Sequence, residues 1–178
     1  MAMGDLVLLE SELNDVISTL QAGGIEQTAV HNHLIGESPH VVYVHFNGHG
    51  DAVAIAKTLR AALEKTKTPI AAAPPATAPA IDLPAADLDS ILGFAGKANG
   101  GTYQFSVPRA EAITDHGIVI PPAAGVATAI NFQSTGSGKA AITGDFVLVA
   151  SEVNPVIRTL RGGGIAVTAL HSHMQLIG

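Results

Sequence analysis

Apolar and polar positions follow two different periods along the chain, and each change of period marks an expected element. A short apolar run at residues 6–9 is typical of a buried strand, and apolar positions spaced three and four residues apart follow it. These spaced positions predict a helix that Ser11 caps and that Gly23 and Gly24 end. The apolar stripe of this helix consists of Leu13, Val16, Ile17 and Leu20.

Two further segments, 27–35 and 40–46, alternate in polarity, which predicts two strands joined by a short turn. Asp51 then caps a second helix, so the order is β-α-β-β-α, most of a ferredoxin-like split unit. In the second half we expect a helix over 86–95 and strands over 103–107, 117–120, 127–133 and 139–149. The expected fold class is α+β, with a duplicated ferredoxin-like unit and additional antiparallel strands.

The duplication is visible as an internal repeat. Residues 4–35 align without a gap to residues 144–175, with 18 identities in 32 pairs. Copy one continues downstream but has nothing upstream, and copy two shows the reverse, so we expect a segment of a longer two-repeat protein, truncated at both ends. The expected domains are 1–67 as the C-terminal part of repeat one, 68–85 as an Ala/Pro linker and 86–178 as the N-terminal part of repeat two.

Three glycines, residues 162–164, follow the helix of the second copy. They resemble a phosphate-binding loop in composition only, because such loops begin a helix and do not follow one. A helix C-cap is therefore the expected role of these glycines.

Composition narrows the possible partners. The net charge of −6, with scattered Lys and Arg, leaves no footprint for nucleic acid, and no apolar run reaches the length of a membrane span. The chain has no cysteine, so His and carboxylate side chains must hold any metal. The expected partner is a small-molecule substrate or ligand of unknown type, and the sequence is compatible with a homo-oligomer.

Each copy carries a His-x-His pair near the end of an expected strand, His31 with His33 and His171 with His173. Alternate residues of a strand share a face, so the two imidazoles of a pair point the same way. In this sequence only copy one is followed by further candidate ligands. We therefore expect His171 and His173 to bind metal much more weakly than the first pair.

Copy one gathers the residues of a candidate metal site. With a turn midway between the two strands, His45 is expected opposite His31 and Tyr43 opposite His33, while Glu37 reaches in from the turn. The predicted metal ligands are His31, His33, Glu37 and His45. Glu37 is also the candidate general base and Tyr43 a hydrogen-bond donor beside the ligands, so these two are the candidate catalytic residues.

Such ligands suit a divalent transition metal, with zinc favoured and manganese, iron or copper as alternatives. If only the three histidines bind, a fourth position is left for water, which points to a metal-dependent hydrolase or lyase. A closed four-ligand shell favours a non-catalytic metal- or small-molecule-binding module instead. A structural repeat protein without metal, whose histidines are ordinary polar residues, is the third possibility, so the sequence leaves open whether the protein is an enzyme.

The strings GDLVLLESELNDVISTLQAGGI and TAVHNHLIGESPHVVYVHFNGHGDA, with GGTYQFSVPRAE ahead of the second copy, resemble the LppY/LpqO-type family of bacterial lipoproteins. The most distinctive part is His31-Asn32-His33, Glu37, Pro39 and His45-Phe46. The likeness covers nearly all of the chain except the linker. It implies a domain of unknown function whose members include exported lipoproteins, and hence an extracytoplasmic location, although no signal peptide is visible in this sequence. It implies no reaction.

Overall fold

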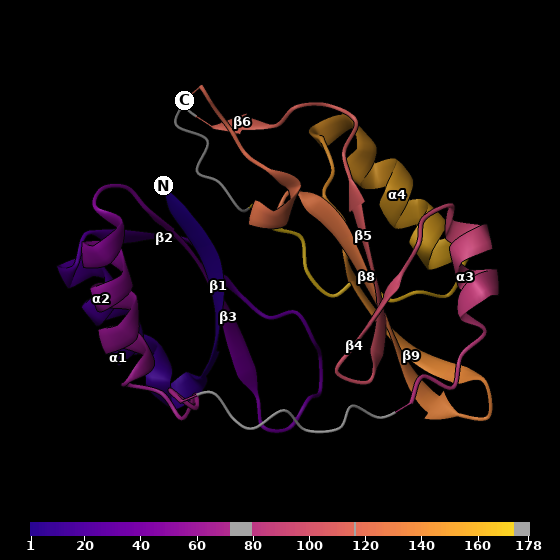
Figure 1. The fold of residues 1–178 in the computed structure, drawn as a ribbon, viewed down its shortest axis with the longest axis horizontal. Helices are drawn as coiled ribbons and strands as arrows, with labels where there is room; N and C mark the ends of the chain where they lie inside the picture. The colour runs from indigo at the N-terminus through magenta and orange to yellow at the C-terminus, as the bar shows by residue number, and fades with distance from the viewer. Residues whose placement is uncertain (72–79, 116, 173–178) are drawn as a thin grey trace. The chain divides into compact units, whose positions relative to one another are not determined.

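The computed structural model describes residues 1–71, 80–115 and 117–172 (Figure 1). Helices and antiparallel sheets are both present, which confirms the predicted α+β class. The described residues form two compact units, one of residues 1–71 with 152–172 and one of residues 80–151 without residue 116. Within the described ranges, no helix is both long enough and apolar enough to cross a membrane.

A three-stranded antiparallel sheet with two helices forms most of the first unit. Its elements are β1 (Ala2–Leu9), the 3-10 turn η1 (Glu10–Glu12), α1 (Leu13–Ala22), β2 (Ile25–His31), β3 (Val41–Gly48) and α2 (Ala52–Leu63), followed much later in the chain by α4 (Ala150–Gly162). The strand order is β1-β3-β2. Because β3 lies between the two strands that α1 connects, the unit has the split β-α-β arrangement.

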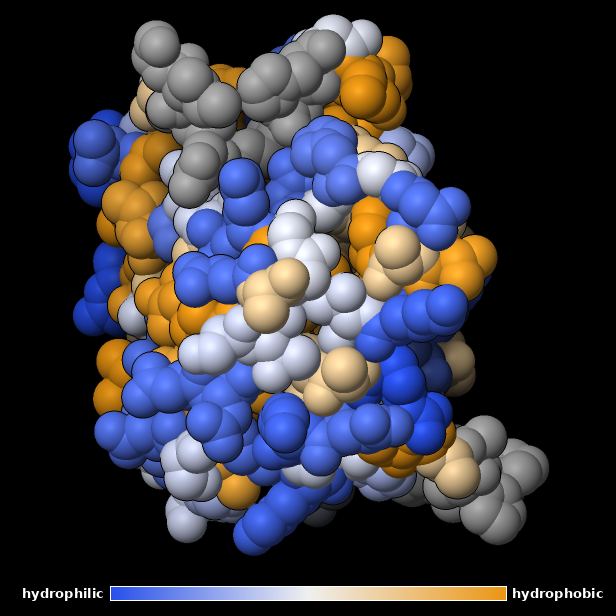
Figure 2. All heavy atoms as spheres, turned by 90° about the vertical axis from the view of Figure 1, so that its left-hand side faces the viewer, coloured by the Kyte–Doolittle hydropathy of each residue, from blue (hydrophilic) through white to orange (hydrophobic). Residues whose placement is uncertain are grey.

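The core of this unit lies between one face of the sheet and the helices α1 and α2. Its buried side chains are Leu8, Val16, Leu20, Ile25, Val44, Phe46, Ile55 and Ala62. Val16 and Leu20 are four residues apart on α1, and Val44 and Phe46 are two apart on β3, so each period directs its apolar residues into the core. The outward side of these helices, which faces the viewer in Figure 2, is covered largely by hydrophilic and neutral residues.

The helices α1 and α2 begin in different ways. The Asp51 carboxylate accepts a hydrogen bond from the backbone N–H of Ala54 at 2.8 Å, which confirms the predicted cap of α2. The predicted cap of α1 is wrong, because Ser11 lies inside η1 and makes no capping bond. Glu12 precedes α1 without a side-chain capping bond to it, and its carboxylate instead accepts from the backbone N–H of Leu9 at 2.9 Å, at the start of η1.

The register of β2 on β3 differs by two residues from the predicted one. His31 lies opposite Tyr43, and Ala29 lies opposite His45 after a bulge in β2. The midpoint of the β2–β3 connection is therefore one residue earlier in the chain than assumed. Because β2 ends at His31, His33 lies beyond the strand. The predicted pairs are therefore wrong. A shift by an even number nevertheless leaves every side chain on its face, so the histidines still lie on the face away from the core.

The second unit contains a four-stranded antiparallel sheet of order β4-β5-β8-β9. Its elements are α3 (Ala85–Leu92), β4 (Lys97–Asn99), β5 (Thr102–Pro108), β6 (Thr114–Asp115), β7 (Ile118–Val119), the 3-10 turn η2 (Pro122–Ala124), β8 (Ala127–Gly136) and β9 (Lys139–Asp145). The last strand is shorter than predicted and ends at Asp145. The Tyr103 hydroxyl donates to Asp89 at 2.8 Å and ties the sheet to α3.

The second copy of the repeat does not form a second ferredoxin-like unit among the described residues, so the predicted duplication is not confirmed as a structure. Its helix α4 corresponds to α1, but residues 146–149 and 165–172, which align with parts of β1 and β2, form no strand. In the first unit both outer strands pair with β3 and not with each other. Residues 146–149 and 165–172 pair with no such central strand among the described residues.

The three glycines end α4. The N–H of Gly164 donates to the Arg161 carbonyl at 3.1 Å, and the N–H of Ile165 donates to the Leu160 carbonyl at 2.9 Å. Gly164 has a φ of +79°, which a residue without Cβ adopts readily. These bonds are those of a Schellman motif and confirm the predicted C-cap.

Candidate metal centre

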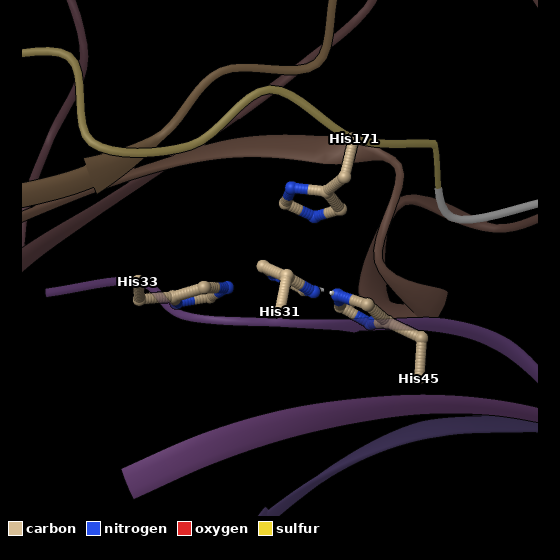
Figure 3. A group of neighbouring side chains, drawn as sticks. All are labelled: His31, His33, His45 and His171. Carbon is tan, nitrogen blue, oxygen red and sulfur yellow. Dashed lines mark hydrogen bonds between the residues drawn. The ribbon is translucent and has the colours of Figure 1, made fainter. Parts of the chain in front are cut away.

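Four imidazoles meet on the sheet face of the first unit that points away from its core (Figure 3). They belong to His31, His33, His45 and His171. One ring nitrogen of each lies within 4.8 Å of the corresponding nitrogens of the others. Three of these residues come from copy one and one from copy two, so the chain brings both copies to one place.

His45 is the most enclosed member of the cluster, with 2% of its surface exposed. It lies in the central strand, opposite Asp5 of β1 on one side and Ala29 of β2 on the other. Its ring nitrogen Nδ1 makes a hydrogen bond with Oδ1 of Asp5. Because an ionised carboxylate can only accept, Nδ1 carries the proton and the lone pair of His45 is at Nε2.

That Nε2 atom faces Nε2 of His31 at 3.4 Å. The two ring planes differ by only 12°, and Figure 3 shows the two nitrogens pointing at one another. Two nitrogens that coordinate one tetrahedral zinc, with Zn–N bonds of about 2.0–2.1 Å, are separated by about 3.4 Å. The distance between His31 and His45 therefore matches that between two ligands of one ion.

The ring of His33 is stacked against that of Tyr43. It stacks on Tyr43 with ring centroids 3.8 Å apart and an angle of 8° between the planes. Tyr43, predicted as a hydrogen-bond donor to the ligands, thus packs its ring against the face of the His33 ring. The centroid of His33 lies 4.8 Å from that of His31.

His171 reaches the cluster from the segment that follows α4. Its ring stacks on that of His31 with centroids 3.6 Å apart, and lies 5.0 Å from that of His45. Three residues earlier, the Thr168 hydroxyl donates to the His33 carbonyl at 2.5 Å. His173, the other histidine of the second pair, lies outside the described residues.

Glu37 does not belong to the cluster. Its Oε1 atom accepts from the backbone N–H of Val41 at 3.2 Å and lies 3.0 Å from Nδ1 of His40. The other ring nitrogen of His40 is 2.9 Å from the amide of Asn32, which also donates to the Val41 carbonyl at 3.1 Å. Glu37 therefore joins the two ends of the β2–β3 connection, and a role as ligand or general base has no support from this geometry.

These contacts have a consequence for stability. Hydrogen bonds from its own backbone N–H and from that of Val41, with His40 beside it, lower the pKa of Glu37 below its ordinary value of 4.5. A lowered pKa means that the folded chain favours the carboxylate, so the contribution is present above pH 4.5 and is lost as the pH falls through the lowered pKa.

We therefore expect Glu37→Gln to be less stable than the wild type near pH 7, with a difference that shrinks below about pH 4.5. Urea unfolding of both proteins between pH 7 and pH 3 measures this difference. A difference that is the same across the whole range would contradict the assignment of the effect to the Glu37 charge.

Sequence reasoning missed Asp5 and did not place His171 in the first site. A signal for Asp5 was present, because the repeat keeps a Gly-Asp pair at this point as Gly4-Asp5 and Gly144-Asp145, ahead of apolar strand residues. In copy one this repeated aspartate, Asp5, contacts the ring of His45.

The fold and the site define an α+β protein with a four-histidine cluster that could bind a metal. A family model described as "Domain of Unknown Function (DUF1259)" matches residues 1–65 and 86–176, and the chain belongs to this family. The match includes both copies of the repeat and omits the Ala/Pro tract between them. No curated protein and no solved structure was found to match the chain.

Proposed function

We propose that this protein binds one divalent transition metal ion, with His31, His33, His45 and His171 as the ligands. The observation that carries the proposal is the meeting of four ligand nitrogens within 4.8 Å, on strands and segments from both copies. Asp5 strengthens it, because a carboxylate behind a metal-binding imidazole fixes the tautomer and raises the basicity of the ligand.

Electrostatics favours a cation in this cluster. The facing nitrogens of His31 and His45, 3.4 Å apart, must share either a proton or a metal ion, since two bare lone pairs repel. A shared proton can form a hydrogen bond between only one pair of facing nitrogens. A divalent ion can accept the lone pairs of all four imidazoles at once.

The donor set indicates which metals fit. Imidazole nitrogen is a good ligand for zinc, copper, nickel and iron, whereas manganese prefers oxygen. Because Glu37 is directed to Val41 and His40, the cluster contains no carboxylate ligand. Zinc, which accepts four nitrogen ligands in a tetrahedron, is therefore the metal that we propose.

The number of imidazoles bears on the type of function. Four of them complete a tetrahedral shell, which favours a metal-binding module over the hydrolase or lyase that three ligands would suggest. For the location, the resemblance to LppY/LpqO-type lipoproteins supports an extracytoplasmic site of action, which we also propose.

Metal-free protein is expected to take up about one Zn²⁺ per chain, because the described residues contain one such cluster. Calorimetric titration and elemental analysis after dialysis measure the stoichiometry. His49→Ala, which removes an exposed histidine outside the cluster, is the matched control and should keep the same value. Protein that shows no binding of Zn²⁺, Mn²⁺, Fe²⁺, Cu²⁺ or Ni²⁺ would exclude the site.

A further inference from the structure

Three of the four histidines are held by the sheet, and the fourth is not. His31 and His45 lie in paired strands, and the Tyr43 ring stacks on His33 two residues after β2 ends. His171 belongs to the extended segment 165–172, which forms no strand among the described residues.

The segment that carries His171 is attached lightly. It follows the Schellman motif that ends α4, whose hydrogen bonds, together with one from the Arg161 side chain to the Ile165 carbonyl at 3.1 Å, hold the first residue of the segment. The exposed fractions of its apolar side chains are 48% for Ile165, 37% for Val167 and 71% for Leu170, so they anchor it poorly. Thr168 provides a specific contact, its bond to the His33 carbonyl.

The position of the His171 ring relative to His31 also differs from that of His45. The lone pair of an imidazole lies in the ring plane, so two ligands of one ion must turn their ring edges toward it. His31 and His45 do so, with facing nitrogens 3.4 Å apart. His171 instead lies over the face of His31, 3.6 Å between centroids and 28° between planes, and must rotate to share the ion.

We infer that His171 is a displaceable ligand, and that a small anion takes its coordination position on the metal. The inference rests on the proposed metal site. An ion bound by His31, His33 and His45 alone would carry its full double positive charge, because neutral imidazoles bring no negative charge. An anion with an oxygen or nitrogen donor is therefore the class of ligand that this position favours. Release of His171 converts a closed shell into the three-histidine arrangement of catalytic zinc sites.

The test uses Co²⁺ in place of zinc, since its visible absorption reports coordination geometry, and azide as the anion. Azide is titrated into the Co²⁺ forms of the wild type, Thr168→Val and Thr159→Val. Thr159 donates to a carbonyl within α4 at 3.1 Å, so its variant removes a hydroxyl of similar environment without touching the cluster. Co²⁺ affinity is measured separately for His171→Ala and His31→Ala.

Azide is expected to change the Co²⁺ spectrum of the wild type. Thr168→Val should bind azide at least about threefold more tightly, because loosening the segment raises the fraction of protein in which the position is open. Thr159→Val should match the wild type. His171→Ala should lose no more than about tenfold in Co²⁺ affinity, much less than His31→Ala.

An unchanged spectrum in azide overturns the inference, and so does an azide affinity that is the same in all three proteins. A loss of Co²⁺ in His171→Ala as complete as in His31→Ala also overturns it. The wild-type and Thr168→Val titrations decide the matter even if His171→Ala fails to fold. Failure of every protein to bind Co²⁺ would instead reject the metal site itself.

Discussion

Replacing His45 by alanine is expected to lower the affinity for Zn²⁺ at least about a hundredfold, since loss of a group behind a ligand already costs about 10–100-fold. His45 has the strongest position of the four, in the central strand, 2% exposed, with Asp5 bound to one ring nitrogen and His31 facing the other. Calorimetric titration of the metal-free variant measures the loss.

Val44→Ala is the matched control, because Val44 is the neighbour of His45 and lies fully buried on the opposite face of β3. It should cost about 2 kcal/mol of unfolding free energy, as deletion of buried methyl groups does, and leave Zn²⁺ affinity unchanged. Urea unfolding of the metal-free proteins provides the second measurement. Intact metal binding in His45→Ala, combined with a stability loss equal to that of Val44→Ala, would make His45 a core residue and remove it from the site.

Removal of the carboxylate behind His45 should have the next largest effect on metal binding. Asp5→Ala is expected to lower Zn²⁺ affinity about 10–100-fold, because the imidazole loses the acceptor that orients it and raises its basicity. Asp5→Asn keeps an oxygen that can accept from Nδ1, so it should recover part of the loss.

Glu26→Gln is the control for the Asp5 variants. It removes one negative charge from an exposed position of β2 in the same sheet. If Glu26→Gln lowers the affinity as much as Asp5→Ala does, the effect of Asp5 is one of overall charge. The contact between Asp5 and His45 would then have no special role in holding the metal.

The sequence by itself determined the elements of the first unit and the faces of its strands. Val16 and Leu20 on α1, like Val44 on β3, point into the core because helical and strand periods are local properties of the chain. The same alternation predicts that His31 and His45 lie on the face away from the core. Local periodicity survives a two-residue error in register, since an even shift changes no face.

Only the tertiary structure decided which residues complete the cluster. Asp5 meets His45 across 40 positions of sequence, and Thr168 meets His33 across 135. No local period encodes such contacts, because they depend on how strands and segments are placed after folding. Glu37 is the opposite case, a residue that the sequence placed in the site but that is not part of the four-histidine cluster. Its spacing from the histidines suggested a ligand, whereas in the structure its Oε1 atom contacts the backbone N–H of Val41 and the ring of His40.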